Sequence, residues 1–174
     1  LAAVAQIGDV YYSSLQNAIT AAPDSTATTV TMVANTNESN ITIAATKNIN
    51  LNVNSKTITG NMTNSGTLSL SSGTIVGNGS ITISNSGTLT ITSMNITNNN
   101  RVLNNTGTTT LKSGTLTCNF SGYAHAVVNS KTFTMTGGSI ILNELSGATS
   151  GIGAALYTSA GTTNVTGGKI SASA

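Results

Sequence analysis

Hydrophobic and polar residues alternate along most of this chain, and the alternation recurs in copies of one module. The module reads roughly Asn-x-Gly-Thr-Leu-x-Leu-x-x-Gly-Thr-Ile-x-x-Asn, and its copies begin at Asn64, Asn85, Asn105, Asn129 and Ser159. A period of two predicts short, half-buried β-strands. Repetition of one strand-rich unit indicates a solenoid, because each unit buries its apolar face only by stacking on its neighbours.

Two apolar positions mark each coil of the predicted solenoid. The first position is occupied by Met32, Val53, Leu70, Ile91, Leu111, Met135 and Val165. From Val53 onward, a second apolar residue follows five positions later, at Ile58, Ile75, Ile96, Leu116, Ile140 and Ile170. The corner between them contains Gly73, Gly114, Gly138 or Gly168, with Lys56 and Met94 in two other coils. Glycine is suited to such a corner because it adopts left-handed or crowded backbone conformations at low cost.

A third short strand completes each coil. Its copies are Ile81–Ile83, Arg101–Leu103, His125–Val127 and Ala155–Tyr157. Three strands per coil predict an all-β fold, a right-handed parallel β-helix of about six to seven coils.

Asparagine recurs at two corners of the predicted coil. One set is Asn61, Asn78, Asn99, Asn119 and Asn143, and the other is Asn64, Asn85, Asn105 and Asn129. Equivalent residues of a parallel solenoid lie about 4.8 Å apart, so their amides are expected to form hydrogen-bonded ladders that satisfy corner backbone groups.

The two ends of the chain differ. Residues 1–27 are predicted to form a cap, followed by a solenoid over residues 28–174. Within the cap, Leu15, Ala18, Ile19 and Ala22 share one face of a short helix that Pro23 and Asp24 end,. This helix is expected to shield the strand edges at the open end of the stack. The last residues, 171–174, offer no matching cap, so we expect a longer solenoid or a last coil covered by a partner.

Composition narrows the functional class. Only 6% of the residues are charged, and the net charge of +2 comes from dispersed residues, so no basic cluster indicates a nucleic-acid partner,. The single cysteine, Cys118, excludes an internal disulfide and is expected to face inward with Leu142 and Ala172,. The chain contains no run of 18 apolar residues, so no membrane-spanning helix is predicted. The N-terminus has no signal-peptide pattern, so any secretion signal is expected to have been removed. Few cysteines, few charges and many Asn-x-Ser/Thr triplets favour an extracellular or cell-surface protein of a bacterium.

The chain resembles β-helix repeats of large bacterial surface proteins. The opening Tyr-x-Ser-Leu-x-x-Ala-Ile-x-Ala-Ala, followed by Gly-Thr-Leu-Thr-Ile copies, is similar to right-handed β-helix repeats of the pectin-lyase-like superfamily. The Ile-x-x-Asn element and the glycine-rich stretch 150–157 resemble repeats of chlamydial polymorphic membrane proteins and related adhesins, although the Gly-Gly-Ala-Ile-type motifs are degenerate here. This resemblance implies a β-helix fold. It also implies an adhesin, because proteins with such repeats are mostly adhesins, while lyases and glycosidases share the scaffold.

The acidic residues do not indicate an enzyme. Polysaccharide cleavage on this scaffold needs clustered carboxylates, as acid and base or as calcium ligands. The chain has only Asp9, Asp24, Glu38 and Glu144, which lie far apart in the sequence. We therefore expect no catalytic residues, no bound metal and no cofactor.

Insertions collect at one rim of the predicted stack. The coils lengthen between the second and third strands, in residues 119–124 and 144–153, and insertions on one side of a solenoid commonly form its binding side. The candidate binding residues at this rim are Phe120, Tyr123, His125, Arg101 and Glu144. Arg101 and His125 start equivalent strands in consecutive coils, where they could hold an anion or a sugar carboxylate, or could simply be two unrelated residues at strand starts. The first hypothesis is therefore a non-catalytic adhesin or stalk that presents these loops to a glycan or protein partner.

The outward positions of the first strand support a second hypothesis. They form a nearly continuous array, namely Thr29/Thr31, Asn50/Asn52, Thr67/Ser69, Thr88/Thr90, Thr108/Thr110, Thr132/Thr134 and Thr162/Asn164. Paired side chains lie about 6.7 Å apart along a strand and about 4.8 Å apart between coils. This array resembles the ice-binding faces of β-solenoid antifreeze proteins, although threonine also suits any exposed strand. A carbohydrate-active enzyme on the pectin-lyase-like scaffold is the third hypothesis.

Overall fold

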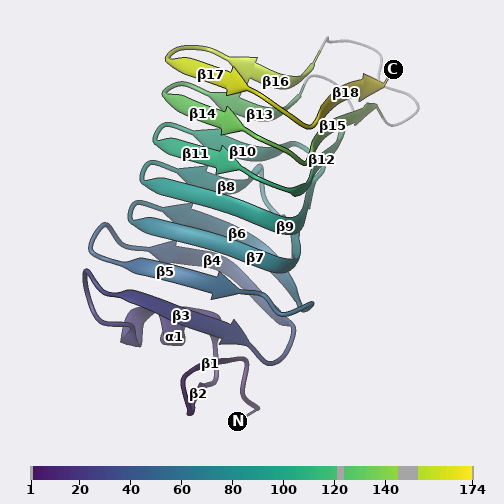
Figure 1. Cartoon of the computed structure of the whole chain (residues 1–174). Coiled ribbons are helices and arrows are strands. Elements are labelled where there is room, and N and C mark those ends of the chain that lie inside the picture. The colour runs from purple at the N-terminus through teal and green to yellow at the C-terminus, as the bar shows by residue number, and fades with distance from the viewer. Residues whose placement is uncertain (1, 121–123, 145–152, 174) are drawn as a thin grey trace.

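The chain folds into a right-handed β-solenoid with one short helix near its N-terminus (Figure 1). The computed structural model describes residues 2–120, 124–144 and 153–173. The N-terminal elements lie at one end of the stack and the last strands at the other. The predicted fold class is therefore confirmed.

Three faces of parallel strands make up the solenoid. The first face contains β3 (Ala27–Met32), β5 (Asn48–Asn52), the first parts of β7 (Thr67–Val76) and β9 (Thr88–Asn98), then β11 (Thr108–Leu111), β14 (Thr132–Met135) and β17 (Thr162–Val165). The second face contains the first parts of β4 (Thr36–Ile43) and β6 (Thr57–Asn64), the second parts of β7 and β9, then β12 (Gly114–Phe120), β15 (Ser139–Glu144) and β18 (Lys169–Ser173).

The third face contains the second parts of β4 and β6, then β8 (Ile81–Asn85), β10 (Arg101–Asn105), β13 (His125–Asn129) and β16 (Ala154–Thr158). Seven strands of the described residues thus stack on the first face, which leaves about five turns with a neighbour on both sides. The predicted six to seven coils agree with this stack when the two end turns are included.

Inward side chains form continuous apolar columns. Ile58, Ile75, Ile96, Leu116 and Ile140 stack in register on the second face and are fully buried. Cys118 pairs with Leu142, which pairs with Ala172, as the alternation predicts. Burial raises the pKa of the Cys118 thiol to about 11, so the thiol is protonated at neutral pH,.

The predicted register is wrong by two residues at the step from the second coil to the third. Leu51, not Val53, stacks on Leu70, whereas the pairing of Thr31 with Asn52 agrees with the predicted equivalence of Met32 and Val53. The cause is a longer corner in this coil. Asn54 and Ser55 both adopt positive φ, at 54° and 59°, and add two residues between the first and second strands. Val53 is still fully buried because it packs inside that corner.

The corners confirm the glycine prediction in part. Gly114, Gly138 and Gly168 adopt positive φ, but Ser72 and Ser93 take that conformation in the two preceding coils. Gly73 is needed for a different reason. A Cβ atom there would lie 2.2 Å from Cγ1 of Val53, so no side chain fits.

The cap covers the N-terminal end as predicted, with an additional strand pairing. Helix α1 (Leu15–Ala21) buries Leu15, Ala18 and Ile19, and Ser14 caps it by accepting a hydrogen bond from the Asn17 N–H at 3.1 Å,. Strands β1 (Ala5–Ile7) and β2 (Val10–Tyr12) form a hairpin, and β1 also pairs antiparallel with β3. The helix therefore covers the core, whereas β1 occupies the strand edge.

The opposite end presents inward-facing positions to solvent. Val165 and Ile170 continue the columns that Met135 and Ile140 form, yet they are 45% and 42% exposed. Ala172 is also exposed.

Candidate functional site

The four carboxylates occupy separate places. Glu38 accepts hydrogen bonds from the backbone N–H groups of Leu15 and Gln16 at 2.7 and 2.9 Å, so it serves the N-terminus of α1,. Asp24 forms an ion pair with Lys47 at 2.9 Å, and the hydrogen bond from Lys47 lowers the pKa of that carboxyl. Asp9 lies in the β1–β2 turn, and Glu144 ends β15. Within the part of the chain that the structure describes, no three of His, Cys, Asp and Glu gather as a metal site would require.

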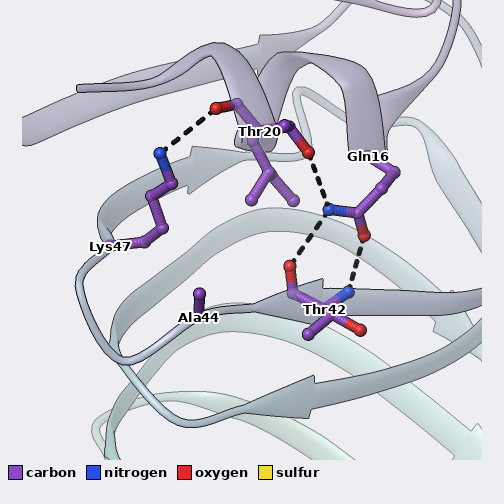
Figure 2. Close-up of a pocket in the computed structure, with 6 residues that line it drawn as sticks. Gln16, Thr20, Thr42, Ala44 and Lys47 are labelled. Carbon is purple, nitrogen blue, oxygen red and sulfur yellow. Dashed lines mark hydrogen bonds between the residues drawn. The ribbon is translucent and has the colours of Figure 1, made fainter. Parts of the chain in front are cut away.

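A small pocket of about 230 Å³ lies where α1 meets the first coil, but its polar groups are used within the protein (Figure 2). Gln16 donates to the Thr42 carbonyl at 3.1 Å and accepts from the Thr42 N–H at 2.7 Å. The Lys47 ammonium donates to the Thr20 carbonyl at 3.1 Å and to the Ala22 carbonyl. These contacts hold the helix against the solenoid, so the polar groups of the pocket have a structural role at this junction.

A second concavity, of about 320 Å³, lies on the corner between the first and second faces. It is lined by polar and small residues, namely Ser55, Ser72, Gly73, Thr74, Ser93 and Asn95. None of the described residues that line it is charged. This corner therefore offers hydroxyl contacts without a charged anchor.

The third face brings Arg101 and His125 together. The β10–β13 register pairs Leu103 with Val127, which places Arg101 opposite His125 in consecutive coils, as predicted. His125 is buried, and its Nδ1 accepts a hydrogen bond from the Ala154 N–H at 3.0 Å. Burial lowers the pKa of His125, and the positive charge of Arg101 lowers it further,. The imidazole is therefore neutral at pH 7, with its proton on Nε2.

Tyr157 is part of this group, although the sequence prediction omitted it. Its ring stacks on that of His125, with centroids 4.6 Å apart and planes 11° apart, and the residue is 45% exposed. Tyr157 lies opposite Val128 in the register, so it occupies an outward position of the third face. The repeat alignment could have revealed it, because Tyr157 is equivalent to Ser84 and Asn104, which occupy the same outward position in earlier coils.

The remaining predicted rim residues have different outcomes. Phe120, a candidate binding residue of the rim, is only 4% exposed and packs in the core, so its ring is not presented at the surface. The reason is its place in β12, where it continues the inward alternation of Leu116 and Cys118. Glu144 is half-buried at the end of β15, opposite Phe120. Tyr123 and most of loops 119–124 and 144–153 lie outside the residues that the structure describes.

The first face carries two rows of polar side chains in register. One row is Ala27, Asn48, Thr67, Thr88, Thr108, Thr132 and Thr162, and the other is Thr29, Asn50, Ser69, Thr90, Thr110, Thr134 and Asn164. The predicted equivalences hold from Thr67 onward. In the first two coils the two-residue shift places Ala27 and Asn48 in the row of Thr67, where the sequence predicted Thr29 and Asn50. Threonine therefore dominates the face from β9 to β14, and asparagine dominates it in β5.

Comparisons with known proteins add no relative: no family model, curated protein or solved structure matches the chain. No helix among the described residues is long and apolar enough to span a membrane.

Proposed function

We propose that the chain is a non-catalytic β-helix module of an extracellular surface protein, which acts as a rigid rod and binds a glycan or protein partner. The observation that carries this proposal is the register-matched stack, which repeats the same outward polar positions from coil to coil. A surface of this kind makes many weak polar contacts at a regular spacing. The separate placement of the carboxylates also favours binding over catalysis, because glycoside cleavage needs two of them at one bond.

The resemblance to β-helix repeats of bacterial surface proteins and adhesins agrees with this proposal. It also favours the extracellular location, as do the low charge and the single cysteine. A lyase or glycosidase of the pectin-lyase-like scaffold receives less support, since Glu38 serves the start of α1, Asp24 pairs with Lys47 and Glu144 ends β15, far from either.

We expect the purified chain to be retained on an array of glycans and extracellular matrix proteins without changing what it binds. The measurement is fluorescence of labelled protein on the array, followed by mass spectrometry of the bound glycans after prolonged incubation. Retention with intact glycans is the expected result. Shortened or unsaturated glycan products would contradict a non-catalytic role, and failure to bind any surface would contradict a binding module.

Ice binding is a second candidate function, and the two threonine rows of the first face favour it. Rows in register on consecutive strands produce a lattice of hydroxyl and methyl groups spaced at about 4.8 Å and about 6.7 Å,. Because water molecules in ice are also regularly spaced, such a lattice could order them on its surface.

If this face binds ice, replacing Thr110 with tyrosine should remove thermal hysteresis, because the bulky ring would separate the lattice from an ice plane. Thr117→Tyr is the matched control. Thr117 is a half-buried, outward-facing threonine on the second face, so its replacement should leave hysteresis unchanged. Round ice crystals and no freezing-point gap with the unaltered chain would reject this candidate.

A further inference from the structure

Arg101 carries a positive charge that the chain does not neutralise. Of the four acidic side chains, Asp24 is paired with Lys47 and Glu38 serves the start of α1. Neither Asp9 nor Glu144 forms an ion pair with Arg101 within the described residues. The stretches outside that description contain no Asp or Glu in the sequence. A half-buried guanidinium without a counter-charge is a site to which an anion is attracted.

Most hydrogen-bond donors of Arg101 are also unused. A guanidinium has five N–H donors. In the described structure one is engaged, Nη1 with Oδ1 of Asn104 at 3.4 Å, and Nε is buried without a partner. A donor buried without an acceptor is unfavourable, so an incoming acceptor that reorients the guanidinium would relieve that cost. A carboxylate suits this role because its two oxygens match the planar fork of arginine.

An oriented aromatic ring lies on the same face. Tyr157 is held by its stacking on His125, and His125 is held by the Ala154 N–H. Arg101 and Tyr157 belong to strands β10 and β16, which are separated only by β13. Arg101 is level with Ala154, and Tyr157 lies three residues further along β16, so their Cα atoms are about 14 Å apart, a span suited to a short oligosaccharide,. A fixed ring face provides an apolar contact for one sugar while the cation holds the charge of another.

We propose that Arg101 and Tyr157 form a binding site for an acidic glycan, in which a uronic acid carboxylate pairs with Arg101 and a neighbouring sugar packs against Tyr157. This inference rests on the proposed function, since it names the partner class and the face of a binding module. His125 is a positioning residue that orients Tyr157. The site takes a charged oligosaccharide in preference to a neutral one.

The test compares a glucuronate-containing hyaluronan hexasaccharide with the same hexasaccharide after methyl esterification, by isothermal titration calorimetry. The ester keeps the sugar rings but removes the charge. We expect the unaltered chain to bind the acid at least tenfold more tightly than the ester. Arg101→Gln should remove that preference, whereas Lys131→Gln, which deletes an equal charge at an exposed corner residue, should preserve it. Tyr157→Ala should weaken binding of both ligands.

Thermal melting curves of each variant establish that it is folded. If Arg101→Gln is unfolded, the exposed Tyr157 supplies the deciding variant, and unchanged affinity of Tyr157→Ala for the acid would overturn the proposal. Equal affinity of the unaltered chain for acid and ester, or equal losses in Arg101→Gln and Lys131→Gln, would overturn it too. Retention of the unaltered chain on the glycan and protein array, together with equal affinity for acid and ester, would reject this site and leave the proposed function standing.

Discussion

Replacing Asn105 with alanine is expected to lower the free energy of unfolding by about 3–5 kcal/mol, because several buried polar groups lose their partners at once. Asn105 is fully buried, and its amide donates to Asn129 Oδ1, the Thr132 carbonyl and the Gly107 carbonyl at 2.8, 2.8 and 3.2 Å. Its Oδ1 accepts from Asn85 at 2.9 Å and from Thr109 at 2.8 Å. Urea denaturation followed by circular dichroism measures the change.

The matched control for this prediction is Asn99→Ala. Asn99 belongs to the other predicted ladder but is exposed, so its replacement should change stability by less than about 0.5 kcal/mol,. If the two variants unfold at the same urea concentration, the buried ladder does not stabilise the stack.

Replacing Leu111 with alanine is expected to cost about 2–5 kcal/mol, because it removes buried methyl groups and leaves a cavity between coils. Leu111 is fully buried and stacks between Ile91 and Met135 in consecutive coils. Stability in a solenoid arises from contacts between neighbouring repeats, so a cavity in a central coil weakens both of its interfaces. Differential scanning calorimetry should show a lower Tm.

The adjacent residue Lys112 provides the control, because its side chain is exposed. Lys112→Ala should leave Tm nearly unchanged. An unchanged Tm for Leu111→Ala would mean that the column of inward residues is misassigned.

Sequence periodicity predicted the stack well wherever a coil has a regular corner. From Leu70 onward the two apolar positions are separated by one short corner, so counting apolar residues reproduces the observed register. The count failed at Leu51 because two residues with positive φ, Asn54 and Ser55, lengthen the corner. Neither is glycine, so no residue type signalled the extra length.

The two asparagine ladders show the same limit. All four members of the buried ladder, Asn64 to Asn129, are hydrogen-bonded as predicted. In the other set, Asn61 bonds Asn78 and Asn143 bonds Asn119, but Asn99 is exposed and, among the described residues, joins neither neighbour. The preceding residue, Asn98, is buried instead and donates to Thr82 Oγ1 at 2.8 Å. Three consecutive asparagines offer equivalent side chains, so only packing decides which one faces inward.

The candidate site was less predictable than the fold. The equivalence of Arg101 and His125 followed from the repeat alone. The stacking of Tyr157 on His125 did not follow from the repeat, because the two residues are not equivalent. Tyr157 occupies an outward position within β16, whereas His125 begins β13 in the previous coil. The burial of Phe120 depends on where β12 ends, which the sequence of the corner does not mark.

The buried ladder also gives the rod an electrical direction. Asn64 donates to Asn85, Asn85 to Asn105 and Asn105 to Asn129, so every amide dipole in the row points the same way along the axis. Dipoles of strand peptides alternate and largely cancel, whereas aligned hydrogen-bonded amides polarise one another. The row therefore acts as a small macrodipole, with its positive pole toward β17 and its negative pole toward the capped end. Charged groups brought to the two ends of the row would experience opposite potentials, although the backbone at both ends is built from the same repeat.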